Sequence, residues 1–232
     1  MKVYAISDLH LSINNPKPMD IFGGNWENYV DVIVKNWNRK IKDDDIVLIA
    51  GDISWALRQS EVKKDIEFIS KLKGTKVIIK GNHDYWWQSL TSLRNELPEN
   101  FFAIQNDAIR LGNVVICGSR GWIAPEDGKF KTEEDEKLYK REIIRMELSL
   151  QSAKSIMQDD DTLIVMTHFP PFNSRFQDND MQYIFEKYGV NKVVYGHLHN
   201  AERKQKMKFT KHKIQYYLTS CDHLGNNPVR IF

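Results

Sequence analysis

Cysteine is scarce in this chain, with only Cys117 and Cys221 among 232 residues. Two thiols cannot form the disulfide framework on which small secreted domains depend. Because both cysteines lie in apolar sequence, we predict buried free thiols in a reducing compartment. A single disulfide between them is the less favoured alternative.

The sequence also lacks a long hydrophobic run. No apolar stretch approaches the ~20 residues of a membrane helix, and Asp8 interrupts the first run, which starts at Val3. We therefore expect no signal peptide and no membrane partner, and a cytoplasmic protein. A large excess of charge is missing as well, since the formal net charge is +2. Overall electrostatics thus neither favour nor exclude nucleic acid as a partner.

Apolar runs alternate with amphipathic stretches along the first half of the chain, which favours a partly parallel sheet. The pattern predicts strands over residues 3–6, 46–50 and 77–79. It predicts helices over 26–41, over a stretch that Ser60 caps and Gly74 ends, and over 85–97.

The second half of the chain mixes hairpins with helices. It predicts hairpins of 108–111 with 114–117 and of 204–209 with 214–218, helices over 132–157 and 181–188, and strands over 163–166, 193–195 and 229–232. Together the two halves predict one mixed α/β (α+β) domain over residues 1–232, with a two-sheet core and helices outside.

Five short polar motifs follow strand-like runs and contain five of the seven histidines. Loops after parallel strands open at the same sheet edge, so these side chains should gather there. In extended backbone, residues i and i+2 point the same way, so paired motif residues should address one cluster. The motifs supply Asp8 with His10, Asp52, Asn82 with His83 and Asp84, His168, and His197 with His199.

This set of side chains has the composition of a dimetal site. A carboxylate can bridge two cations, and mixed oxygen and imidazole ligands suit Mn²⁺, Fe or Zn²⁺ better than Ca²⁺. Each motif alone also has a structural interpretation: a turn at Asp52, a satisfied core histidine at His168, or a helix cap at Asn82 or Asp84. Five such motifs in fixed order outweigh those interpretations.

The order Asp-x-His, Gly-Asp, Gly-Asn-His-Asp, His and Gly-His-x-His resembles the calcineurin-like metallophosphoesterase family, from Asp8 to His199. The resemblance implies a sandwich of two mixed β-sheets flanked by helices, with two divalent ions at one edge. Mn²⁺ is the first choice, and Fe, Zn²⁺ or Ni²⁺ are alternatives. The resemblance implies that one ion is held by Asp8, His10, Asp52 and His199, and that Asp52 bridges to a second ion held by Asn82, His168 and His197.

The resemblance also implies roles in hydrolysis, by in-line attack of a hydroxide held between the ions. His83 would stabilise the transferring phosphoryl group or protonate the leaving oxygen, Asp84 would orient His83, and Asn82 would also contact the substrate. The family's protein phosphatases continue Gly-Asp with Tyr-Val-Asp-Arg-Gly and have Glu where this chain has Asp84, which weighs against a protein substrate. We expect a small-molecule phosphodiesterase. The alternatives are a nuclease and a non-catalytic metal-binding scaffold for protein contacts, and the sequence does not specify the oligomeric state.

Arg120 is a candidate for holding a substrate phosphate, because it follows a strand and a guanidinium suits oxyanions. A surface salt bridge is its structural alternative, and Arg58 and Arg175 are weaker candidates. Several aromatic residues near the motifs, among them Phe22, Trp26 and Trp55, would anchor the core or stack a nucleobase, and we favour the first.

Two segments have open interpretations. The irregular stretch over residues 13–25 would be a flap over the metals or only a long loop. The lysines of residues 204–213 would contact an anion or nucleic acid, or else protect an edge strand, and we favour the second.

Overall fold

The computed structural model describes residues 1–199 and 207–232. In them, a first sheet has the strand order β11-β1-β2-β3-β4, and all its neighbours are parallel except β11 with β1. Its strands are β1 (Val3–Ile6), β2 (Ile46–Ile49), β3 (Thr75–Ile78), β4 (Phe101–Ala103) and β11 (Val229–Arg230).

A second sheet has the order β5-β6-β7-β8-β10-β9, with parallel pairs in the middle and an antiparallel strand at each edge. Its strands are β5 (Ala108–Leu111), β6 (Val114–Gly118), β7 (Thr162–Met166), β8 (Lys192–Tyr195), β9 (Lys208–Lys211) and β10 (Ile214–Leu218). Both sheets are therefore mixed, as predicted.

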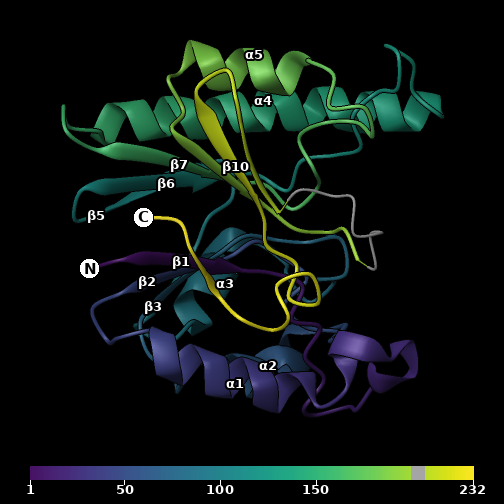
Figure 1. Cartoon of the computed structure of the whole chain (residues 1–232), viewed down its shortest axis with the longest axis vertical. Helices are drawn as coiled ribbons and strands as arrows, with labels where there is room; N and C mark the ends of the chain where they lie inside the picture. Colours follow the sequence, from purple (N-terminus) through teal and green to yellow (C-terminus); the bar gives the residue numbers. More distant parts are fainter. Residues whose placement is uncertain (200–206) are drawn as a thin grey trace.

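Helices cover the outer face of each sheet, so the layers run helix, sheet, sheet, helix (Figure 1). In that view α1 and α2 lie below the first sheet and α4 and α5 lie above the second. The helices are α1 (Tyr29–Lys40), α2 (Gln59–Ser70), α3 (Leu90–Glu96), α4 (Glu133–Ile156) and α5 (Asp180–Lys187), with short 3₁₀ turns at Asp20–Phe22 and Gly24–Trp26.

The strands alternate their apolar side chains between two cores, because successive residues point to opposite faces. In β2, Leu48 packs between the sheets whereas Val47 and Ile49 face the helices. In β7, Ile164 packs between the sheets whereas Leu163 and Val165 face α4 and α5. The predicted two-sheet sandwich with outer helices is therefore confirmed.

Several predicted helix boundaries are wrong, each for a local reason. The first helix starts at Tyr29 because Trp26 lies in a 3₁₀ turn and Asn28 has a left-handed backbone. Ser60 is inside α2, whose N-cap is Arg58. The third helix covers only Leu90–Glu96, and its N-cap is Ser89, whose side chain accepts a hydrogen bond from the Ser92 amide.

The predicted strands agree with the structure better than the helix boundaries do, but the shortest strand was not predicted. β4 was not predicted, since three residues are too few to show alternation. The second hairpin turns at His212 and Lys213, inside the predicted turn, and the predicted residues Lys204 and Lys206 lie outside the described ones. The β9 strand is an edge strand, as the protected-edge interpretation requires, and Lys211 forms an ion pair with Asp178.

Two further sequence predictions concern cysteine and membranes. Cys117 and Cys221 are free and buried, as predicted, and burial raises the pKa of the Cys117 thiol to about 12. None of the helices in the described residues is long and apolar enough to cross a membrane.

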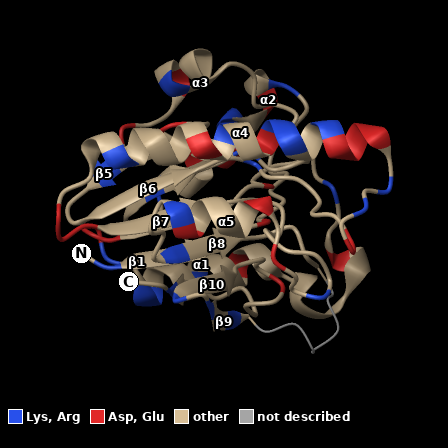
Figure 2. Ribbon diagram, turned by 90° about the horizontal axis from the view of Figure 1, so that it is seen from above, with Lys and Arg blue, Asp and Glu red and all other residues tan. Residues whose placement is uncertain are grey.

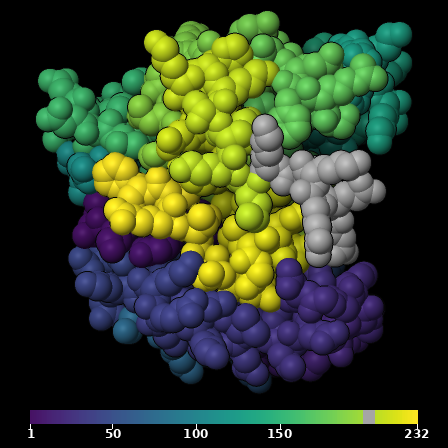
Figure 3. Space-filling model, viewed as in Figure 1, coloured from purple at the N-terminus to yellow at the C-terminus, as the bar shows by residue number. Residues whose placement is uncertain are grey.

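The last segment of the chain joins the two halves of the sandwich. In Figure 3 it lies across the boundary between the N-terminal layers and the C-terminal layers. Backbone hydrogen bonds fix it there, from Ser7 N to Thr219 O at 2.7 Å and from Cys221 N to Ser7 O at 3.0 Å. This contact brings residues after β10 next to the loop that follows β1.

Candidate metal centre

The loops after β1 and β2 run side by side and bring the first two motifs together. The Asp8 amide donates to Gly51 O at 2.9 Å, and the His10 amide donates to Asp52 O at 3.0 Å. Both loops leave the carboxyl edge of a parallel strand pair, where ligand sites of such sheets form. The strand topology therefore places Asp8, His10 and Asp52 at one edge.

The backbone at this edge is left-handed rather than extended. The φ angles of Asp8, His10, Asp52 and His197 are 58°, 44°, 52° and 70°. We predicted that extended backbone would make paired motif residues point the same way. Asp8 and His10 do converge, but the extended backbone given as the reason is wrong. A left-handed residue other than glycine costs on the order of 1–3 kcal/mol and clusters at functional sites.

Two motif glycines allow the loops to approach one another. A Cβ on Gly81 would collide with the backbone amide and carboxylate of Asp52, and a Cβ on Gly196 would collide with Asp8 and Ser7. A side chain at either position would displace a carboxylate. Glycine is therefore required, because the neighbouring loop lies too close for a Cβ atom.

A first group of possible ligands consists of Asp8, His10 and His199, whose donor atoms all lie within 4.8 Å of one another. His10 Nε2 lies 3.2 Å from His199 Nε2, and His199 Nε2 lies 3.4 Å from Asp8 Oδ1. His199 is oriented from behind, because its Nδ1 lies 3.0 Å from an oxygen of Asp222. Such a carboxylate–imidazole pair fixes the ring and the tautomer of metal-binding histidines.

A second group contains Asn82, His168 and His197. Asn82 Oδ1 lies 2.7 Å from His168 Nε2 and 2.8 Å from His197 Nδ1, and the two ring nitrogens are 3.3 Å apart. His168 is fully buried, and its Nδ1–H donates to the backbone carbonyl of Ala50 at 2.9 Å. In the neutral ring, Nε2 is therefore the nitrogen that carries the lone pair, and it faces the amide oxygen of Asn82.

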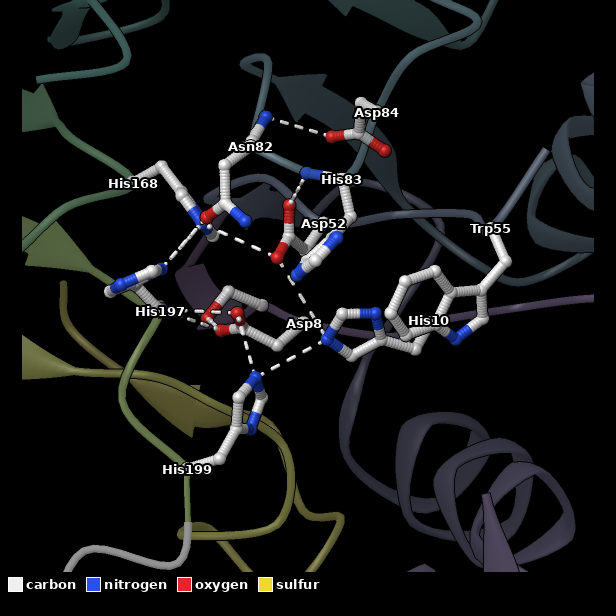
Figure 4. A network of polar contacts seen from close by, with 12 residues as sticks. Asp8, His10, Asp52, Trp55, Asn82, His83, Asp84, His168, His197 and His199 are labelled. Atoms are coloured by element: carbon white, nitrogen blue, oxygen red, sulfur yellow. Dashed lines mark hydrogen bonds and ion pairs between the residues drawn. The ribbon is translucent and has the colours of Figure 1, made fainter. Parts of the chain in front are cut away.

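The carboxylates of Asp8 and Asp52 lie between the two groups (Figure 4). Asp52 Oδ2 lies 3.8 Å from His10 Nε2 and 3.4 Å from His168 Nε2, so imidazoles from both groups face one oxygen. Asp8 also belongs with Asp52 and His168 in a second set of mutually close donors. All seven predicted metal ligands therefore meet at one site.

Burial and the carboxylates act in opposite directions on the imidazole pKa values at this site. Burial lowers the pKa of His10 and of His197 to about 4. Burial also opposes charge on His168 and His199, but Asp52 raises the pKa of His168, and Asp222 with Asp8 raises the pKa of His199 to about 10. Each group thus contains one imidazole whose pKa is lowered and one whose pKa is raised.

The donor set fits divalent ions. Two lone-pair atoms, His168 Nε2 and Asn82 Oδ1, would repel at 2.7 Å unless a proton or a cation lies between or beside them. The buried carboxylates of Asp8 and Asp52 likewise need opposite charge nearby. Oxygen and imidazole ligands in this mixture suit Mn²⁺, Fe or Zn²⁺.

His83 lies beside Asp52 and the first group, and its ring has no ion pair or hydrogen bond with a described residue. Its amide donates to Asp52 Oδ1 at 2.8 Å, which places the ring near His10, with centroids 5.6 Å apart. Trp55 contacts both rings: it stacks on His10 at 4.7 Å and meets His83 at 4.6 Å. His83 therefore occupies the position of a side chain that can act on a group bound at the centre.

Asp84 does not hold the His83 ring, contrary to the prediction. Its Oδ1 accepts from the amides of Ile53 and Ser54 at 2.8 and 3.2 Å and from Trp86 Nε1 at 3.0 Å, and its Oδ2 accepts from the Gly81 amide at 2.8 Å. In Figure 4 its carboxylate lies on the far side of the loop from the His83 ring. Asp84 is buried and connects the loops after β2 and β3, so it positions Asp52 and His83 through the backbone.

Arg120 lies beside the centre, but no described metal-group side chain contacts its guanidinium. Its backbone carbonyl accepts from the amides of His168 and Phe169 at 2.9 and 3.0 Å, whereas its guanidinium lies 4.8 Å from the centroid of the Trp122 ring. The guanidinium lines a separate cavity. The other candidates lie elsewhere: Arg58 is the N-cap of α2, and Arg175 forms an exposed ion pair with Asp127.

An aromatic cavity of about 160 Å³ opens on the first ligand group. The segment over residues 13–25 contributes Met19 and Phe22 to its wall, and its movement as a flap stays a prediction. The aromatic cavity is lined by His10, Met19, Phe22, Trp26, Trp55, His83 and His199.

The sequence reasoning missed Asp222 and gave Trp55 no position beside His10. Asp222 follows β10, far from the motifs in sequence, and only the contact of this segment with the β1 loop brings it to His199. No spacing rule signals such a residue. Trp55 had a signal, since it lies three residues after Asp52, but periodicity could not separate it from core tryptophans such as Trp86.

Comparison with known proteins gives an independent result. A family model described as calcineurin-like phosphoesterase matches residues 1–201. Over 209 residues the chain is 23% identical to an uncharacterized metallophosphoesterase of Helicobacter pylori, covering 87% of this chain and 45% of that one. It is also 23% identical over 209 residues to a probable cyclic nucleotide phosphodiesterase of Coxiella burnetii, covering 86% and 76%.

A shorter match is stronger in identity. Over 84 residues the chain is 38% identical to an uncharacterized protein of Methanocaldococcus jannaschii, covering 36% of this chain and 47% of that one. The matched regions thus span about half the length of the archaeal and Helicobacter relatives.

Solved structures share the fold at low identity. TT1561 of Thermus thermophilus superposes with a TM-score of 0.55 at 11% identity, covering 99% of this chain and 97% of that one. The phosphopantetheinyl hydrolase of Mycobacterium tuberculosis superposes with a TM-score of 0.54 at 15% identity, covering 94% and 88%.

Proposed function

The chain belongs to the calcineurin-like phosphoesterase family, and from this premise we propose that it uses two divalent ions to hydrolyse a small-molecule phosphodiester. Membership of the family indicates phosphoester hydrolysis, and the bond type and substrate are the proposal. The observation that carries it is the convergence of lone-pair atoms from five separate loops on the carboxylates of Asp8 and Asp52.

The ligand assignment follows the two groups. Asp8, His10 and His199 would hold one ion, Asn82, His168 and His197 would hold the other, and Asp52 would contribute to both. Mn²⁺ is the preferred metal, with Fe, Zn²⁺ or Ni²⁺ as alternatives. When bound, the ions supply positive charge to the phosphoryl oxygens and lower the pKa of an attacking water to ~7.

His83 acts on the leaving group. It is the imidazole of the site that lies outside both ligand groups, and it lines the aromatic cavity with His10 and His199. A protonated His83 would donate to the leaving oxygen, which otherwise departs as an unfavourable alkoxide. Trp55 restricts the ring, and the bond from the His83 amide to Asp52 ties its position to the bridging carboxylate.

The aromatic cavity supports an organic group on the leaving side of the phosphorus. Trp26 and Trp55 offer flat apolar surface within the wall that also contains His83. Monoesters and diesters both have an organic leaving group, so the preference for a diester rests on the phosphodiesterase relative. The likeness to a probable cyclic nucleotide phosphodiesterase supports a substrate with a nucleobase, which can stack on tryptophan.

A nucleic-acid substrate is less well supported. The formal net charge is +2, and Lys211 in the basic hairpin is already paired with Asp178. Binding to a phosphate backbone would require unpaired basic residues along a surface.

The test is a metal-reconstituted assay. Protein stripped by chelator and reloaded with Mn²⁺ should hydrolyse bis-p-nitrophenyl phosphate faster than p-nitrophenyl phosphate, and the stripped protein should hydrolyse neither. Faster hydrolysis of the monoester would reject the diester assignment, and cleavage of oligonucleotides in preference to both would favour a nuclease. Two bound ions without hydrolysis of any phosphoester would favour a scaffold.

A further inference from the structure

A second cavity, separate from the aromatic one, lies where the ends of β3 and β6 meet α4. Its volume is about 220 Å³, and it shares no lining residue with the aromatic cavity. The residues on which its chemistry depends are Lys80, Ser119, Arg120, Arg141, Glu142 and Arg145.

The lining carries an excess of positive charge. The lining contains four basic side chains and one carboxylate, that of Glu142, so its formal charge is +3. Glu142 is fully buried and accepts from Arg145 at 2.7 Å, with Arg141 Nε at 3.8 Å. The concentration is local, because basic and acidic residues are interspersed along α4 as a whole (Figure 2).

Three polar groups of the lining lack a hydrogen-bond partner among the described residues: the Ser119 hydroxyl, the Arg120 guanidinium and Glu142 Oε2. The Ser119 hydroxyl is buried, with the residue 2% exposed, and no described residue forms a hydrogen bond with it. The Arg120 guanidinium lies over the Trp122 ring and forms no ion pair with a described residue. A buried hydroxyl and a half-buried guanidinium without partners are costly, unless a ligand supplies an acceptor.

The cations of the lining gather around one cavity, so they repel one another, with Glu142 as the carboxylate among them. Lys80 has one acceptor, Trp87 O at 3.0 Å. An oxyanion would relieve this repulsion and accept from several donors at once, as arginine clusters do for phosphate.

The second cavity adjoins the second ligand group. Lys80 precedes Asn82 by two residues, and the Arg120 carbonyl accepts from the His168 amide at 2.9 Å. The aromatic cavity adjoins the first group instead. An apolar cavity thus adjoins the first ligand group, and residues of a cationic cavity neighbour the second.

We propose that the second cavity is an oxyanion-binding site that takes a phosphoryl-sized group on Ser119, Arg120 and Arg141. The group is either a second phosphate of the substrate or a free oxyanion such as released phosphate. The two sources share the same chemistry, and the experiment distinguishes them.

The first measurement is calorimetric titration of the metal-loaded protein with inorganic phosphate. Two classes of site are expected, one at the metal centre and one in the second cavity. Arg120→Gln should weaken one class by about 10- to 100-fold, since hydrogen bonds to charged groups contribute ~1.5–3 kcal/mol. Arg120→Lys should weaken it less, because it keeps the charge but not the planar fork.

The matched control is Arg39→Gln, which removes the same charge from an exposed position on α1. It should leave both classes unchanged. Ser119→Ala gives a second test if Arg120→Gln unfolds, and it should weaken the same class. A titration that shows no phosphate site, or an Arg120→Gln variant that binds phosphate like the Arg39→Gln control, would overturn the proposal.

The second measurement identifies the source of the anion. Two phosphodiesters that differ only in one terminal phosphate are compared in wild type and in Arg120→Gln. A rise in KM confined to the terminally phosphorylated diester assigns the cavity to the substrate, and equal KM ratios with lost phosphate binding assign it to a free oxyanion. The calorimetry requires no hydrolysis. It would therefore still test the oxyanion site if the protein proved not to hydrolyse phosphodiesters.

Discussion

The two ligand groups of the metal centre differ in what orients their imidazoles. His168 donates to a backbone carbonyl, that of Ala50, and is fully buried. His199 is held by a side chain, that of Asp222, and its own side chain is 27% exposed. His168 of the second group is therefore fixed to the backbone after β2, whereas His199 of the first group depends on a segment that arrives from the C-terminal part of the chain.

This difference indicates how each group responds to substitution. A backbone carbonyl remains when a side chain is changed, so the orientation of His168 should persist through most substitutions around it. The orientation of His199 rests on one carboxylate and on the contact between Ser7 and residues 219–221. We expect the first group to be the more easily weakened half of the centre.

The largest expected effect comes from replacing Asp52, the carboxylate that lies near imidazoles of both groups. Asp52→Ala should abolish binding of both ions and lower phosphodiester hydrolysis on the order of 10⁴-fold or more, because both imidazole sets lose their common carboxylate. Elemental analysis with kinetics measures both effects. Asp159→Ala, an exposed aspartate in a distant turn, is the control. Retention of one ion at full occupancy would show that the groups are independent.

His83→Ala should separate chemistry from metal binding. Both ions should remain, while kcat falls by about 10²–10⁴-fold, the usual contribution of a general acid. The loss should be smaller for a p-nitrophenol leaving group, which needs little protonation, than for an alkyl alcohol. Equal losses for both leaving groups would contradict an acid role and leave His83 as a stabiliser of the phosphoryl group.

Asp222→Asn should affect one group alone. We expect the affinity for one ion to fall about 10- to 100-fold, as for other carboxylates behind a metal-binding imidazole, while the other ion is retained. Stepwise metal titration resolves the two affinities. Equal weakening of both ions would remove the distinction between side-chain and backbone support.

Trp55→Leu should have the smallest effect. Loss of flat surface from the aromatic cavity should raise KM about tenfold for a diester with an aromatic leaving group, given ~1–3 kcal/mol per stacked base. A diester with a short alkyl group should be affected less. A uniform fall in kcat with unchanged KM would instead assign Trp55 to the support of His10 and His83.

The ligands could be predicted from the sequence because their motifs directly follow strands. The apolar pattern predicts where these strands end better than it predicts other boundaries. Asp8, Asp52 and His168 each follow a run whose buried residues are confirmed. The sequence did not predict the role of Asp222, which depends on a contact with a loop more than 200 residues earlier in the chain. It also did not predict the four hydrogen bonds by which Asp84 supports the loops and does not hold the His83 ring.

Helix starts failed for a related reason. Trp26 and the stretch over residues 85–89 have the composition of helices, but their side chains are used by the site and the core, which hold the backbone in turns. Local propensity is a weak guide where tertiary contacts determine the backbone. The same holds for the left-handed angles of Asp8 and His10, which no local pattern predicts.

The most direct test of a dimetal centre is anomalous diffraction from crystals of the Mn²⁺-loaded protein. We predict two peaks about 3.5–4 Å apart, one on each side of the Asp52 carboxylate, the first beside His10 and His199 and the second beside His168 and His197. A single peak, or peaks that lie away from Asp52, would contradict the account.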